Sequence, residues 1–259
     1  ASLTGINNLD GTDVSWALTN TGSNNWDLAV AGGGSDQSGQ VIHVDDDELT
    51  NITIANSGTV WSTENTAIEF DGTTITGTAT LTNIDLGTVA SGSTTTDEAA
   101  IKIQDTTGTI NITNNGLITS ATQGILNTNS IINTIINGST GILEATSEGS
   151  QADQYAGLKN AESSTITTLT NEGLIQANQI FGVGLRNDGT FTQISNTDQI
   201  IGKRGLLNNN TGVISNLTNS DTGIISGSNS MGLSNNGTVG WLLNDGIIRS
   251  LSSKENKYG

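Results

Sequence analysis

Carboxylates are the first residues of this sequence to consider for chemistry. The 259 residues include 25 acidic and 8 basic ones. Carboxylates at equivalent points of neighbouring repeats can cleave polysaccharides as general acid and base. Asp198, Asp221 and Asp245 recur in this way, but each precedes an aliphatic pair at a turn, where Asp is favoured for backbone reasons. We therefore expect no catalytic residues and a protein that is not an enzyme.

The acidic run Asp45, Asp46, Asp47 and Glu48 is a candidate calcium site, because carboxylate oxygens bind Ca²⁺. The run lacks the spacing of an EF-hand loop, and the glycine-rich segment 32–36 is not a calcium-binding nonapeptide repeat. A solvated acidic loop is the favoured interpretation, with calcium binding as the alternative.

His43 is the only histidine, and the chain has no cysteine. A single histidine excludes a metal site with several histidine ligands, and any Ser-His-Asp triad would have to use this residue. Without cysteine there are no disulfides and no thiolate chemistry. We expect no cofactor.

A repeat supplies the elements that would position such residues. It is clearest between residues 171 and 249, where a polar turn is followed four times by an aliphatic pair. The four copies are 171–175, 197–201, 221–225 and 244–248. Their turn residues Gly173, Gln199, Gly223 and Gly246 are 26, 24 and 23 residues apart. A period in this range predicts a solenoid.

Each repeat contains three short segments rich in Ile, Val, Leu and Thr and bounded by Asn, Gly, Ser or Asp. This composition favours strands and turns and disfavours helices. Three strands per repeat predict an all-β fold, a three-sided parallel β-helix of about eight or nine coils. At about 4.8 Å per coil, the rod would be on the order of 45 Å long.

The repeat also divides the chain. Residues 1–50 follow it poorly and are predicted to form an N-terminal cap or irregular first coils, since a solenoid needs an atypical terminal unit. Residues 51–253 form the predicted β-helix and 254–259 a C-terminal tail. No apolar run approaches about 20 residues, so we expect no membrane insertion by this segment. The net charge of −17 argues against nucleic acid as a partner.

Insertions gather at one point of the repeat, and the longest are 91–98 and 145–155. In solenoids such insertions map to one face, which is often the binding face. We predict a binding ridge along one edge of the rod. Its candidate residues are Thr94, Thr95, Asp97, Glu98, Glu148, Gln151, Asp153 and Tyr155.

Two polar patterns accompany the strands. Asn recurs at the end of one strand in each repeat, at Asn127, Asn160, Asn187, Asn208 and Asn235. These residues either stack as a ladder or are simply good turn residues. Thr alternates over residues 74–82, which predicts an exposed β face; an array that orders water would need the pattern on many coils, and it is strong on one segment only.

The Asn-x-Gly-x-Ile repeat with Gly-Leu-x-Asn between, as in 114–118 followed by 124–127, resembles the passenger domains of bacterial autotransporters. The resemblance covers roughly residues 51 to 250. It implies a right-handed three-sided β-helix, an extracellular place at the bacterial outer membrane, and roles in adhesion, self-association and biofilm. The implied partners are other copies of the protein and host or surface glycans.

Two functions from different classes remain open at this stage. The first is a non-enzymatic surface protein for adhesion, self-association or filament assembly, in which a polar rod makes weak multivalent contacts. The second is a polysaccharide-binding or polysaccharide-cleaving β-helix, such as a lyase, a hydrolase or a tailspike-like protein. Clustered carboxylates in a groove would favour the second, and a flat surface of Thr and Asn would favour the first.

Overall fold

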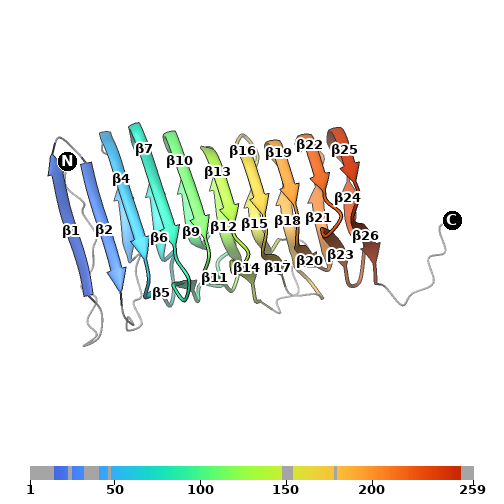
Figure 1. Ribbon diagram of the computed structural model, residues 1–259, viewed down its shortest axis with the longest axis horizontal. Coiled ribbons are helices and arrows are strands. Elements are labelled where there is room, and N and C mark those ends of the chain that lie inside the picture. Colours follow the sequence, from blue (N-terminus) through green and yellow to red (C-terminus); the bar gives the residue numbers. More distant parts are fainter. Residues whose placement is uncertain are drawn as a thin grey trace.

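A computed structural model describes residues 15–22, 25–31, 41–45, 48–147, 154–177 and 180–251. These ranges contain strands and turns and no helix. The strands form three sheets, which we call A, B and C, and together they build one elongated rod (Figure 1).

Sheet A consists of β1 (Ser15–Gly22), β2 (Asn25–Ala31), β4 (Glu48–Asn56), β7 (Thr74–Asn83), β10 (Thr107–Asn114), β13 (Ile131–Asn137), β16 (Thr165–Asn171), β19 (Thr190–Asn196), β22 (Val213–Asn219) and β25 (Thr238–Asn244). Sheet B consists of β5 (Thr59–Ser62), β8 (Thr88–Ser91), β11 (Leu117–Ser120), β14 (Ile142–Ala145), β17 (Leu174–Ala177), β20 (Gln199–Gly202), β23 (Ile224–Gly227) and β26 (Ile247–Ser250). Sheet C consists of β3 (Ile42–Asp45), β6 (Ile68–Asp71), β9 (Ala99–Gln104), β12 (Gln123–Thr128), β15 (Ala156–Asn160), β18 (Val183–Asn187), β21 (Arg204–Asn208) and β24 (Leu233–Asn235).

The chain visits the sheets in the order C, A, B and then begins the next coil. Strands β3 to β26 make eight such turns, and every strand in them pairs in parallel with its equivalent one coil earlier or later. The predicted three-sided parallel β-helix of about eight coils is therefore confirmed.

Strand pairing continues across the predicted boundary between residues 50 and 51. Strands β3 and β4 begin at Ile42 and Glu48, and β2 pairs in parallel with β4. Only β1 breaks the pattern, because it pairs antiparallel with β2. The division into a cap, a β-helix and a tail stays a prediction.

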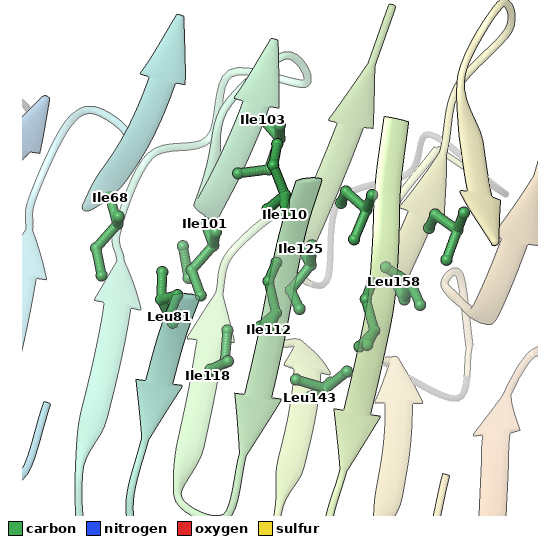
Figure 2. Packing of buried hydrophobic residues seen from close by; sticks show 14 of the residues in the cluster. Ile68, Leu81, Ile101, Ile103, Ile110, Ile112, Ile118, Ile125, Leu143 and Leu158 are labelled. Carbon is green, nitrogen blue, oxygen red and sulfur yellow. The ribbon is translucent and has the colours of Figure 1, made fainter. Parts of the chain in front are cut away.

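Stacked aliphatic side chains fill the interior. In sheet A, Leu81 lies in register with Ile112, which in turn pairs with Ile135, and all three are buried. Ile118 and Leu143 form the equivalent stack in sheet B, and Figure 2 shows these side chains converging between the sheets. Each buried Ile or Leu contributes roughly 1.5 to 3 kcal/mol of hydrophobic stabilisation. The strand alternation follows from this, because inward positions must be apolar.

The asparagine ladder, one of the two alternatives left open by the sequence, exists at the corner between sheets C and A. Each side-chain amide donates through Nδ2 to Oδ1 of the Asn one coil later, at 2.7 to 3.0 Å. Its members are Asn127, Asn160, Asn187, Asn208 and Asn235.

A second, longer ladder occupies the corner between sheets A and B, and the sequence analysis missed it. Its seven amide-to-amide bonds measure 2.7 to 2.9 Å. Its members are Asn56, Asn83, Asn114, Asn137, Asn171, Asn196, Asn219 and Asn244. The repeated Asn before each turn was the available signal. The same amides also bond turn carbonyls, so both alternatives weighed for Asn apply at once.

Replacing an asparagine in the middle of the long ladder should destabilise the rod. Asn171→Leu removes the bonds from Nδ2 to Asn196 Oδ1 and to the Gln199 carbonyl, and it leaves these buried acceptors without that donor. We expect a loss of about 3 kcal/mol in the free energy of unfolding by urea.

The matched control is Asn216→Leu, the same substitution at an exposed position of sheet A, which should change stability by less than about 0.5 kcal/mol. Equal effects of the two substitutions would contradict a stabilising role for the ladder.

Candidate functional site

The two long insertions lie at the same corner of the rod, between sheets B and C. The first joins β8 to β9 and the second joins β14 to β15. Connections at this corner range from one to ten residues, whereas the other two corners use only two or four residues. The predicted concentration of insertions along one edge is confirmed, and whether that edge binds a partner stays a prediction.

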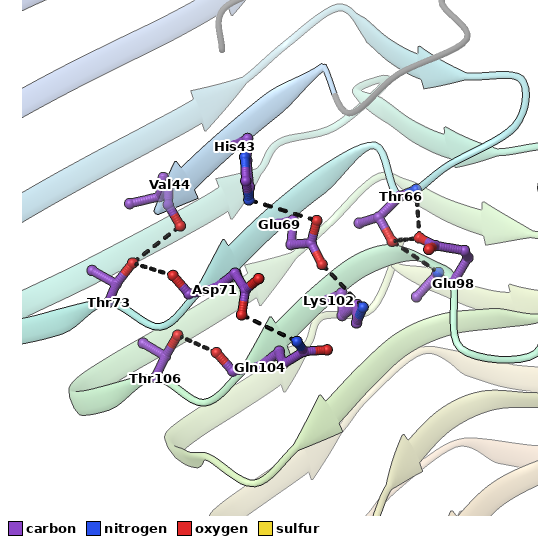
Figure 3. A network of polar contacts seen from close by, with 11 residues as sticks. His43, Val44, Thr66, Glu69, Asp71, Thr73, Glu98, Lys102, Gln104 and Thr106 are labelled. Carbon is purple, nitrogen blue, oxygen red and sulfur yellow. Dashed lines mark hydrogen bonds and ion pairs between the residues drawn. The ribbon is translucent and has the colours of Figure 1, made fainter. Parts of the chain in front are cut away.

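The structure places the ridge candidates in different environments. Thr94, Thr95 and Asp97 are exposed. Glu98 is half-buried, and one carboxylate oxygen accepts hydrogen bonds from the backbone N–H and the hydroxyl of Thr66 in the preceding coil (Figure 3). Glu98 therefore supports the corner, because its carboxylate anchors one coil to the next.

Tyr155 is only 7% exposed and packs against Ala145 and Ala177, so its ring fills the corner and contributes little to its surface. Glu148, Gln151 and Asp153 lie outside the described residues.

The acidic run is only partly described. Asp45 ends β3 and Glu48 begins β4, while Asp46 and Asp47 lie outside the described residues. Within the described ranges, no three His, Cys, Asp or Glu side chains come together as metal ligands do. The calcium alternative stays a prediction.

A polar network on the outer face of sheet C joins the first three coils (Figure 3). His43, Glu69 and Lys102 occupy one outward column in register. Lys102 Nζ lies 3.0 Å from Glu69 Oε1, whereas His43 Nε2 lies 3.8 Å from Oε2, too far for a hydrogen bond. The Glu69 side chain is 5% exposed, so this is a buried ion pair. The sequence analysis missed it, because the pairing depends on the coil-to-coil register.

The outer face of sheet B carries an apolar column. Leu117, Ile142 and Leu174 are half-buried there in register, and Gln199 separates them from the half-buried Ile224; each of these four aliphatic residues is followed by an inward aliphatic residue. The aliphatic pairs of the repeat thus contribute one residue to the core and one to the surface.

Sheet A presents a flat and mostly polar face, with exposed apolar side chains at Ile131, Ile136 and Trp241. The alternating Thr residues of β7 point outward, as predicted, and the register extends the pattern over many coils. One outward column contains Thr53, Thr80, Asn111, Thr134, Thr168, Gln193 and Asn216, none of them buried. A parallel column contains Thr82, Thr113, Ile136, Thr170, Ser195 and Thr218. We call this surface the sheet A face.

The sheet A face is almost free of charge. From β4 to β25, Glu48 is the only ionisable residue in these strands. The net charge of −17 is therefore carried elsewhere, and the sheet A face is the side of the described rod best suited to contact with a neutral or similarly charged surface.

No protein family, curated protein or solved structure matches this chain. The resemblance to autotransporter passengers is therefore supported at the level of the fold, since the chain is a parallel β-solenoid.

In the ranges that the structure describes, no helix is long and apolar enough to cross a membrane.

Removing the Glu98 carboxylate should loosen the insertion corner. We expect Glu98→Ala to lower the free energy of unfolding by about 1 to 3 kcal/mol and to speed hydrogen exchange of the Thr66 amide, which loses its acceptor. Asp97→Ala, at the exposed neighbouring residue, is the control and should leave Thr66 exchange unchanged. Unchanged Thr66 exchange in Glu98→Ala would show that this carboxylate does not hold the corner.

The ion pair on sheet C should behave as a coupled unit. Lys102→Met removes the cation 3.0 Å from the buried Glu69 carboxylate and should cost about 3 kcal/mol of stability. Adding Glu69→Leu should restore most of that loss, because both charges are then gone. A double-mutant cycle in urea measures the coupling; purely additive effects would contradict it.

Proposed function

We propose that this protein is a non-enzymatic β-helix that associates side by side with other copies of itself through the sheet A face. The observation that carries the proposal is the uncharged, in-register array of Thr, Asn, Ser and Gln on that face.

Charge favours this face over the other two. Two copies with a net charge of −17 repel one another, and the repulsion is smallest where the contacting surfaces carry no acidic residues. Sheet C carries Glu69, Lys102 and Arg186 on its outer positions, and sheet B carries Glu144 and Arg249. Salt screens the remaining repulsion between the acidic parts of the rods.

The chemistry of the face suits many weak contacts. Hydroxyls and amides both donate and accept hydrogen bonds, and each such bond contributes only about 0.5 to 1.5 kcal/mol net. Outward positions repeat about every 4.8 Å along the rod, so two rods in contact meet the same spacing on both sides. Many weak contacts at matched spacing produce multivalent association.

The proposed setting is the outer surface of a bacterium, where such contacts hold cells together or to a surface, as the resemblance to autotransporter passengers implies. Cleavage of glycans is the alternative that we do not propose. The buried carboxylates of Glu69 and Asp188 each lie against a cation, which suits a structural role.

Adding negative charge to the sheet A face should abolish self-association. The variant combines Thr80→Asp, Thr168→Asp and Gln193→Glu, all at outward positions of one column. We expect concentration-dependent association in analytical ultracentrifugation, and clumping of beads that display the protein, to fall at least tenfold.

The control places the same three changes of charge on sheet B, as Thr59→Asp, Thr88→Asp and Gln199→Glu. These positions are half-buried outward ones, and the control should associate like the unmodified protein. Equal loss in both variants would mean that net charge alone decides association. A wild-type chain that remains monomeric at high concentration, and on beads, would overturn the proposal.

A further inference from the structure

Lys159 occupies an unusual place on the outer face of sheet C. It lies on β15 in register with Leu126 on one side and Arg186 on the other. Neighbouring strands are about 4.8 Å apart, so the ammonium group and the guanidinium group emerge side by side. Like charges at adjacent positions of a sheet are unfavourable unless an anion lies near them.

The neighbouring cations of this face have their own carboxylates. Arg186 Nε lies 2.8 Å from Asp188 Oδ2, and Lys102 Nζ lies 3.0 Å from Glu69 Oε1. Lys159 forms no ion pair with any carboxylate among the described side chains. Its ammonium group is thus a half-buried cation in direct contact with no carboxylate of the described fold.

Burial lowers the pKa of Lys159, and the positive charge of Arg186 lowers it further, while Asp188 and Asp97 partly oppose the shift. The charged form of Lys159 is therefore less favoured in the free protein than it is in an exposed lysine. An anion from outside the chain would favour that form.

Two depressions flank Lys159, and Ala161 lines both. One, of about 330 Å³, is also lined by Asp97, Lys102, Gln104, Leu126 and Thr128. The other, of about 430 Å³, is also lined by Glu162, Arg186, Asp188, Asn209, Asn210 and Thr211. Volumes of this order lie at the lower end of the range of small-molecule sites, about 300 to 1,000 Å³.

We propose that these two depressions form a binding site for an acidic saccharide, with its carboxylate or sulfate group on the Lys159 ammonium. Amide and hydroxyl side chains around the site, such as Gln104, Asn210 and Thr211, can bond the sugar hydroxyls.

The acidic residues of the lining set the charge of the ligand. Asp97, Glu162 and Asp188 would repel a saccharide that carries an acid group on every ring. The proposed ligand is therefore a saccharide with a single acid group. The proposal is independent of self-association, because the sheet A face is a different side of the rod.

The test is a titration of the ¹⁵N-labelled protein, followed by the amide signals of Gln104, Thr128, Lys159 and Ala161. The probes are cellobiouronate, cellobiose 6-sulfate and inorganic sulfate, with neutral cellobiose as the matched comparison. We expect one acidic disaccharide or both to shift these signals and to bind at least about tenfold more tightly than cellobiose. The carboxylate and sulfate arms show which acid group is recognised.

Three variants connect binding to Lys159. Lys159→Met keeps the aliphatic stem and should weaken binding of the acidic disaccharide at least about tenfold, whereas Lys159→Arg should retain most of it. Lys203→Met removes a lysine elsewhere and should leave affinity unchanged. Circular dichroism confirms that each variant is folded.

The wild-type protein offers a further measurement. Binding should weaken as the pH rises through the lowered pKa of Lys159, because the neutral amine does not attract the acid group. The other charged groups that face the same site are Arg186, Asp188, Asp97, Lys102 and Glu162.

Equal binding of cellobiose and the acidic disaccharides would overturn the proposal, as would unchanged affinity in Lys159→Met. The same holds if none of the probes shifts these signals at about 10 mM. Repeating the titration in the sheet A charge variant keeps the outcome separate from that of self-association.

Discussion

The register between successive coils is the constraint on which the rest of this structure depends. From β13 to β22, parallel pairing in sheet A places each side chain beside its equivalent in the next coil, and a shift by one residue would turn the inward set to solvent. The aliphatic stacks of the interior set the face that is buried. The asparagine ladders further specify the register between coils, because each Nδ2 reaches the next Oδ1 only when the two residues are aligned.

The short ladder shows what happens where the pattern changes along the rod. Its first member is Asn127, whose register partner in the preceding coil is Ile103, and Phe70 precedes Ile103. No donor lies below Asn127, so its buried Oδ1 has no hydrogen-bond partner. An asparagine at 103 would satisfy that oxygen and create the same deficit one coil earlier. The long ladder avoids the problem, since the Gly58 N–H bonds Oδ1 of its first member, Asn56.

Much of the fold could be predicted from the sequence, because the number and spacing of the strands in one repeat determine the shape of a coil. Three strands per period imply three sheets, and uneven spacing reveals the corner that accepts insertions. Individual roles were harder to predict. Tyr155 and Glu98 both lie in insertions, where a binding role was predicted. Tyr155 instead packs into the corner, and Glu98 accepts hydrogen bonds from the preceding coil. The pairing of Glu69 with Lys102, 33 residues later, requires knowing which residues align, and repeats of unequal length conceal that alignment.

The different lengths of the connections at the three corners also distinguish the surfaces of sheets A and C. From β4 to β25, sheet A is bounded by turns of two or four residues, so no long insertion borders this part of its face and a second flat surface can approach it. Sheet C borders the insertion corner, and Asp97, from the first long insertion, reaches the depression beside Lys159. Lys159, a half-buried cation beside loops of variable length, suits a small ligand. The flat sheet A face suits contact with another copy of the rod. The two proposed kinds of recognition would thus use different sides of the same repeat, because its long insertions are confined to one corner.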